Sequence, residues 1–179
     1  MKRQAGMAVL LAAIAFVCVV HAGEPRTAPA DRAKVVAAAR DIMEKARYCT
    51  LVTLGLDGQP QARIVDAFAP EHDMTVWIGT NPVTRKVAEV RKDPRATLLY
   101  FDTTRTSFVT LLGRAEVVTD AAARAKYWKD EWSEHYKDRN RGDDYVLVRF
   151  TPRRLEIVSP ALGFVNDPKT WRPIAIDLR

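Results

Sequence analysis

The sequence predicts an α+β protein with a small, mostly antiparallel β-barrel and helices packed outside it. About seven short strand-like runs follow one another, and most are separated by turn signals rather than by long crossover helices. A parallel dinucleotide-binding sheet would need a G-x-G-x-x-G turn after its first strand, and the sequence contains no such turn. An antiparallel barrel therefore fits the pattern better than a parallel sheet.

The first 22 residues have the pattern of a secretory signal peptide. A basic start, Met1-Lys-Arg3, precedes an uncharged apolar run, and small or apolar residues lead to a cleavage site after Ala22. The run is shorter than the roughly 20 residues of a transmembrane helix, which favours a cleaved signal peptide over the alternative, an uncleaved anchor. We expect one domain, residues 23–179, that is periplasmic or secreted and has no stable membrane association after cleavage.

Charge and cysteine content exclude several classes of protein. Removing the two basic residues of the signal peptide would lower the net charge of +6 by two. Such a mild excess is typical of a solvated surface, and no aromatic-basic motif is present, so we expect no nucleic-acid partner. Cys49 is the one cysteine of residues 23–179, which excludes an intramolecular disulfide there. His72 and His135 are distant in sequence, and we expect no metal site.

The domain is predicted to open with a helix and three strands. Residues 31–47 place apolar side chains at helical spacing, which indicates an amphipathic helix that covers a sheet. Strands at 49–56 and 61–68 flank Asp57-Gly58, a strong hairpin signal. A further strand at 74–79 follows a polar turn, and the three strands together suggest a meander.

A short helix and two longer strands are predicted next. Asn81 is expected to cap the helix, with Pro82 as its first residue. Strands at 95–101 and 107–118 follow it. Gly113 interrupts the second of these strands, which indicates a bulge or a close backbone approach.

The last part of the domain is predicted to contain one helix and three strands. Residues 120–137 carry an aromatic stripe at helical spacing, a pattern that more often marks packing than a cofactor site. Strands at 144–151 and 153–158 meet at Pro152, and a final strand covers 173–178.

Basic and hydroxyl side chains gather where the short helix begins. Thr80, Thr84, Arg85 and Lys86 surround the helix start, and Arg63 lies in the preceding hairpin. A phosphate dianion binds to cations together with hydroxyl or backbone donors, and this segment offers all three. Cations near a helix N-terminus oppose the helix dipole, so they call for a bound anion or a nearby carboxylate. The alternative is an ordinary solvated helix end.

Several short motifs, taken in order, resemble the FMN-binding split barrels of the pyridoxamine 5′-phosphate oxidase superfamily. The motifs are Arg63-Ile-Val65, Thr80-Asn-x-x-Thr-Arg-Lys86, Asp93-Pro-Arg95, Leu98-Leu99 and residues 109–116. Residues 145–150 and Trp171 with the terminal strand are similar to the general stress protein 26 branch. The resemblance implies a six- to seven-stranded, mostly antiparallel split β-barrel with flanking helices.

The resemblance also implies that FMN is the cofactor and that it lies in a cleft between the two protomers of a homodimer. The phosphate cations would be Arg63, Arg85 and Lys86, with Thr84 as a hydroxyl donor. The residues implied beside the isoalloxazine ring, or at the end of the next strand, are Ile64, Val65, Asp66, Gly79 and Thr80.

Three departures from the family pattern argue against oxidation of pyridoxamine phosphate. Phe68 replaces a lysine for the substrate phosphate, Phe108 replaces a glutamine near the flavin, and residues 155–179 lack the Arg-x-His-Asp-Arg motif. We therefore expect a flavin-dependent oxidoreductase that acts on an unidentified small substrate, with its catalytic residues unknown. The alternative is a non-catalytic, stress-associated module that binds flavin or haem.

Overall fold

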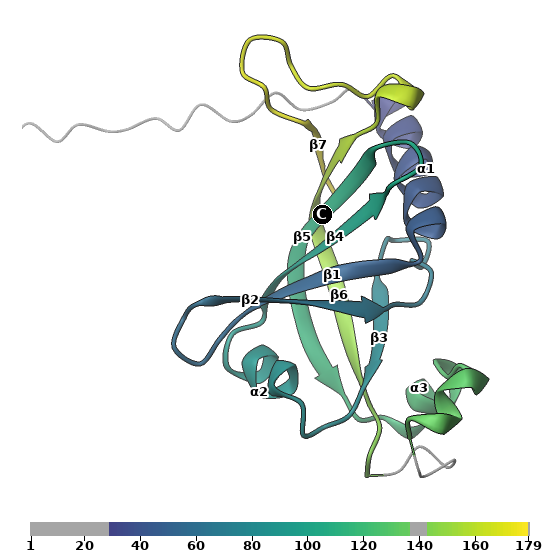
Figure 1. Cartoon of the computed structure of the whole chain (residues 1–179), viewed down its shortest axis with the longest axis vertical. Coiled ribbons are helices and arrows are strands. Elements are labelled where there is room, and N and C mark those ends of the chain that lie inside the picture. Colours follow the sequence, from purple (N-terminus) through teal and green to yellow (C-terminus); the bar gives the residue numbers. More distant parts are fainter. Residues whose placement is uncertain (1–28, 137–142, 179) are drawn as a thin grey trace, which may run out of the picture.

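A seven-stranded antiparallel sheet with flanking helices forms the protein in the computed structural model, which describes residues 29–136 and 143–178 (Figure 1). The elements are α1 (Pro29–Ala46), β1 (Tyr48–Leu54), β2 (Pro60–Asp66), β3 (Val76–Thr80), α2 (Arg85–Lys92), β4 (Arg95–Asp102), β5 (Ser107–Val118), α3 (Ala121–Lys126), η1 (Asp130–Glu134), β6 (Val146–Val158), η2 (Pro160–Leu162) and β7 (Ile174–Asp177). The sheet curls without closing, which confirms the predicted α+β split-barrel fold.

The strand order corrects the predicted meander. The sheet runs β2-β1-β4-β5-β6-β3, and β7 also pairs with β6. Strand β3 therefore lies beside β6, and among the described residues its backbone pairing with the segment after β2 is limited to the isolated bridge between Ala67 and Ile78. The reason is burial, because Val76 and Ile78 enter the main core while Trp77 enters a second, aromatic cluster. A strand that is covered on both faces needs the partner that β6 supplies.

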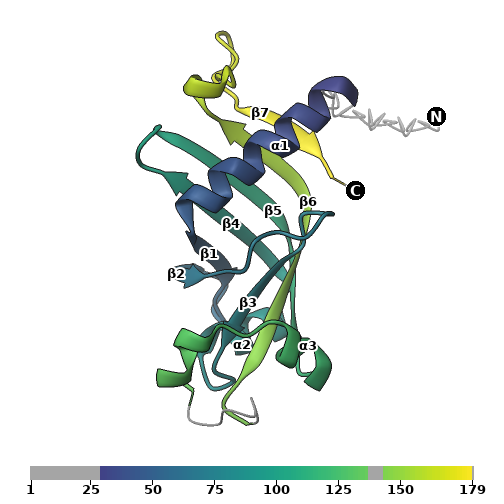
Figure 2. The ribbon, with the colours of Figure 1, turned by 90° about the vertical axis from the view of Figure 1, so that its right-hand side faces the viewer.

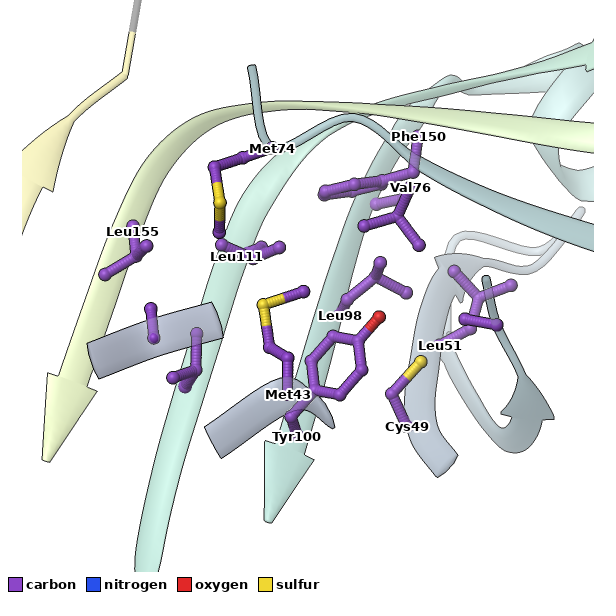
Figure 3. Packing of buried hydrophobic residues seen from close by; sticks show 14 of the residues in the cluster. Met43, Cys49, Leu51, Met74, Val76, Leu98, Tyr100, Leu111, Phe150 and Leu155 are labelled. Atoms are coloured by element: carbon purple, nitrogen blue, oxygen red, sulfur yellow. The ribbon is translucent and has the colours of Figure 1, made fainter. Parts of the chain in front are cut away.

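Helix α1 covers the inner face of the sheet, as its periodicity predicts. Val35, Ala39, Ile42 and Met43 are buried on one side of the helix, which crosses β4 and β5 (Figure 2). Figure 3 shows Met43 beside Tyr100 in the core that the strands share. Burying a large aliphatic side chain stabilises a fold by about 1.5–3 kcal/mol, so this face holds α1 in place.

The predicted irregularity at Gly113 is a β-bulge. The register of β5 against β6 shifts between Leu112 and Gly113, and Gly113 lies opposite Pro152. The prediction of two strands that meet at Pro152 is therefore wrong. Pro152 lies inside the single strand β6. A bulge tolerates proline because the ladder is already interrupted there.

Two predicted helices have different boundaries in the structure. Helix α2 begins at Arg85 with Thr84 as its N-cap, since Asn81 accepts a hydrogen bond from the amide of Val83 and closes a turn instead. The predicted helix over 120–137 is broken into α3 and η1. The break lets Tyr127 stack on Trp77 at a ring distance of 4.4 Å.

No helix in the described ranges combines the length and the apolar character that crossing a membrane requires. The predicted signal peptide lies outside the residues that the structure describes.

We predict that Gly113→Ala destabilises the protein by about 1–3 kcal/mol, the usual cost of overpacking. A Cβ atom at this position would lie 2.3 Å from the carbonyl oxygen of Thr151 and 2.8 Å from the Cα atom of Pro152. Urea denaturation measures the change. Arg114→Ala, an exposed neighbour on β5, should stay within about 0.5 kcal/mol of wild type. Unchanged stability of Gly113→Ala would show that the bulge does not need this close approach.

Candidate functional site

The predicted phosphate residues converge where β2, the end of β3 and the start of α2 meet. Lys86 Nζ donates hydrogen bonds to Thr80 Oγ1 at 2.9 Å and to Thr84 Oγ1 at 3.3 Å. The two threonine hydroxyls lie 3.2 Å apart. The structure thus brings three of the sequence-predicted residues into direct contact around one ammonium group.

A buried carboxylate that sequence reasoning missed lies beside this group. Glu89 is on α2, and its side chain is 4% exposed. It accepts from Arg63 Nη2 at 2.6 Å and from Thr53 Oγ1 at 2.5 Å, while Arg85 Nε lies 3.6 Å from its other oxygen. The i,i+4 spacing of Arg85 and Glu89 was the available signal, because such residues share one helix face.

Glu89 balances part of the positive charge at the start of α2. The first turn of α2 contains no acid, and its two cations oppose the helix dipole. Glu89 pairs with Arg63 and with Arg85, so a nearby carboxylate, one of the two partners that such cations call for, is present. Arg63, Arg85 and Lys86 exceed this one carboxylate by two positive charges.

Lys86 is the cation that these pairs leave without a carboxylate partner in the described ranges. Burial lowers the pKa of Lys86, neighbouring Arg63 and Arg85 lower it further, and Glu89 opposes them by raising it. A half-buried ammonium held only by hydroxyl groups is stabilised by an arriving anion. Together with the exposed guanidinium of Arg85, this donor set suits a phosphate group.

The other predicted residues of β2 lie in three different surroundings. Ile64 is 67% exposed on the outer face of the sheet, whereas Val65 is buried in the core. Asp66 accepts hydrogen bonds from Lys129 Nζ at 2.7 Å and from Trp132 Nε1 at 3.3 Å. Successive side chains of a strand point to opposite faces, so these three side chains do not form one common surface. A flat ring beside β2 could therefore contact their backbone but not all of their side chains.

Gly79 is required by the packing of the second cluster. A Cβ atom here would lie 2.3 Å from the Trp132 ring and 2.7 Å from the Tyr145 hydroxyl. The cluster consists of Trp77, Tyr127, Trp132, Tyr145 and Leu147, with Phe68 packed against it. The predicted aromatic stripe is therefore packing. Because Gly79 has no side chain, Trp132 and Tyr145 can pack directly against the backbone of β3.

A cavity of about 660 Å³ along β5 and β6 lies apart from the Lys86 group, which consists of Lys86 with Arg63, Thr80, Thr84, Arg85 and Glu89. Three of its seven lining residues are arginines, and no sequence-predicted site residue is among the seven. Among the described residues, no three His, Cys, Asp or Glu side chains gather as metal ligands would.

Several solved structures share the fold at low sequence identity. A protein related to general stress protein 26 from Clostridium acetobutylicum is 19% identical with a TM-score of 0.67, over 80% of this chain and 94% of that one. General stress protein 26 from Bacillus anthracis is 18% identical with a TM-score of 0.60, over 68% and 92%. A pyridoxamine 5′-phosphate oxidase-related, FMN-binding protein from Nostoc punctiforme is 13% identical with a TM-score of 0.61, over 86% and 98%.

No curated protein matches the sequence. The family model described as pyridoxamine 5′-phosphate oxidase, however, matches residues 35–159, which is more than half of the chain. This region holds every strand except β7 and all of the Lys86 group. The resemblance inferred from the short motifs is confirmed, and the chain belongs to the pyridoxamine 5′-phosphate oxidase family.

Proposed function

We propose that this protein binds FMN and acts as a flavin-dependent oxidoreductase on a small substrate. The observation that carries the proposal is the half-buried Lys86, held by Thr80 and Thr84 in a group with two uncompensated positive charges. A phosphate monoester dianion matches that charge. Family membership and the FMN-binding neighbour from Nostoc punctiforme support the choice of FMN.

In this proposal the chain holds the cofactor through its phosphate. Lys86 and Arg85 supply charge-assisted hydrogen bonds, Thr84 supplies a hydroxyl, and Arg63 adds positive charge from β2 while it stays paired with Glu89. The flavin would supply hydride or electron transfer when bound. Backbone groups of residues 64–66, 79 and 80 would line the ring.

The environment of Phe68 supports a substrate other than pyridoxamine phosphate. Its ring packs edge-on against Tyr127 at 5.3 Å and against Trp132 at 5.4 Å, and Lys129 Nζ lies 5.1 Å from its centre. This lysine is committed to Asp66. The position that would need a free cation for a substrate phosphate is therefore an aromatic packing site.

We also propose a homodimer with the cofactor cleft between protomers. The outer face of the sheet carries exposed apolar side chains, namely Tyr48, Ile64, Leu99, Phe101 and Leu112. They come from four neighbouring strands, β1, β2, β4 and β5. Exposed apolar side chains gathered on one face of a sheet are typical of an interface, and two-fold pairing is the commonest solution. Sedimentation equilibrium with FMN present that showed only monomer would contradict the dimer.

We also propose that residues 1–22 are a signal peptide that directs export of the protein. The mature domain, residues 23–179, would begin at Gly23 in the periplasm or outside the cell. N-terminal sequencing of the protein from its own compartment tests this, and Met1 retained in a membrane fraction would contradict it.

We expect the protein purified from its own compartment to show flavin absorption bands and to be reduced by NAD(P)H. These results would support an enzyme, because the flavin is the group that accepts hydride. The second function, a non-catalytic stress-associated module, predicts flavin that NAD(P)H does not reduce, or a Soret band from haem.

Lys86→Ala should weaken FMN binding by about 10- to 150-fold, the loss of one charge-assisted hydrogen bond of roughly 1.5–3 kcal/mol. Fluorescence quenching measures the affinity. Riboflavin, which lacks the phosphate, should be almost unaffected, and Thr84→Ala should cost less because its hydroxyl is neutral. Arg91→Ala, an exposed cation on the same helix, is the matched control. Equal weakening of both flavins would mean that Lys86 is not a phosphate ligand.

FMN affinity should fall as the pH rises through the pKa of Lys86, which burial places below the usual 10.5. The sign follows because only the protonated ammonium attracts the phosphate. Lys86→Arg keeps its charge and should flatten this pH profile.

Glu89→Gln should move the fall in FMN affinity to lower pH, because Glu89 raises the pKa of Lys86. The substitution also removes the partner of Arg63, so stability should drop by about 3 kcal/mol. Identical pH profiles for wild type, Lys86→Arg and Glu89→Gln would rule out titration of Lys86 as the cause.

A further inference from the structure

The cavity on β5 and β6 opens on the side of the sheet away from the core. Arg114 and Glu116 are exposed and alternate with buried Ala115, and Arg149 lies between buried Val148 and Phe150. The full lining is Pro94, Arg114, Ala115, Glu116, Arg149, Thr151 and Arg153. Apart from Pro94 and the buried Ala115, the lining is therefore built from the outward side chains of two paired strands.

Strand register gathers positive charge at this place. Arg114 on β5 lies opposite Arg95 on β4 and opposite Thr151 on β6. Like charges directly opposite each other destabilise a sheet. Pro152 is buried at the bulge, and Arg153 emerges on the exposed side just beyond it. Bulges often re-aim side chains beside functional sites.

Nearby acids balance only part of this charge. Asp93 pairs with Arg95 at 2.6 Å, and this arginine's hydrogen bonds lower the pKa of Asp93 to about 2. Glu116 pairs with Arg149. No acid in the described ranges forms an ion pair with Arg114 or Arg153. The cavity thus holds three arginines against one glutamate and keeps an excess of two positive charges.

The chemistry of the lining selects one class of ligand. Guanidinium groups present planar, paired donors that match phosphate oxygens, and Thr151 adds a hydroxyl. A volume of about 660 Å³ falls within the range of small-molecule sites. The Lys86 group is a separate place, because Lys86 is in the first turn of α2 whereas Pro94 follows that helix.

We propose that this cavity is a second anion site that binds a small molecule through a phosphate or diphosphate group. Arg114 and Arg153 are its primary ligands. Arg149 also donates to the anion, but its ion pair with Glu116 lowers the affinity of the site. The proposal does not depend on FMN binding, since none of the residues in the Lys86 group lines the cavity.

Calorimetric titration of the full protein with inorganic pyrophosphate at fixed ionic strength tests the proposal. Arg114→Ala and Arg153→Ala should each weaken binding by about tenfold or more, as expected for a charge-assisted contact. Glu116→Gln should strengthen binding severalfold, because it releases Arg149 and removes a repulsive charge. All three positions are exposed, so the variants should fold.

Two controls separate this site from other sources of binding. Lys34→Ala removes one exposed positive charge from α1, which packs on the core side of the sheet, and it should change affinity less than twofold. Lys86→Ala removes the central cation of the other group, so the pyrophosphate binding that this variant retains belongs to the cavity. Equal weakening by Lys34→Ala would mean nonspecific attraction. A loss caused only by Lys86→Ala would place the anion in the other group, and no binding of pyrophosphate would overturn the proposal outright.

One further outcome would assign the cavity to contact between copies of this chain. If Arg114→Ala and Arg153→Ala dissociate a dimer in sedimentation equilibrium and leave pyrophosphate binding unchanged, the arginines serve an interface and the proposed site is wrong.

Discussion

The buried carboxylate of Glu89 is the constraint on which this end of the molecule depends. A desolvated carboxylate is costly unless it is fully paired, and Glu89 is paired through Thr53 of β1 and Arg63 of β2. These contacts fix α2 against the two strands of the first hairpin. They also occupy Arg63, whereas Lys86 has hydroxyl partners and no carboxylate partner within the part of the chain that the structure describes. One acid therefore sets both the local fold and the distribution of charge around Lys86.

Sequence patterns predicted the helices and strands better than they predicted which strands lie side by side. The hairpin turn at Gly58, the core face of α1 and the bulge at Gly113 are local features, encoded by a turn residue, a periodicity and an interruption. The position of β3 beside β6 is not local. It depends on Val76 packing into the main core on one face while Trp77 packs into the aromatic cluster on the other, and no pattern within β3 itself specifies the partner strand that this placement brings alongside.

The candidate site shows the same division. The cations at the start of α2 could be found from residue types and order alone, and the structure brings Lys86 together with Thr80 and Thr84. Glu89 looked like an ordinary helix-surface residue because its burial comes from packing under the first hairpin. Arg114 and Arg153 are 39 positions apart and become neighbours only through the shifted register of β5 and β6. Such groupings cannot be read from spacing along the chain.

The incomplete closure of the sheet has a mechanical consequence. Every other neighbouring pair of strands is joined by a ladder, whereas the two ends of the sheet meet through the bridge at Ala67 and Ile78, where the amide of Phe68 donates to the carbonyl of Trp77. Parting the molecule along this seam breaks fewer backbone hydrogen bonds than parting it anywhere else in the sheet. The seam is therefore the line of the sheet that the fewest backbone hydrogen bonds hold together. Asp66, which ends β2 beside the seam, accepts hydrogen bonds from Lys129 and Trp132. Because the Trp132 ring packs against Gly79 of β3, these side chains link the two ends of the sheet where the backbone does so least.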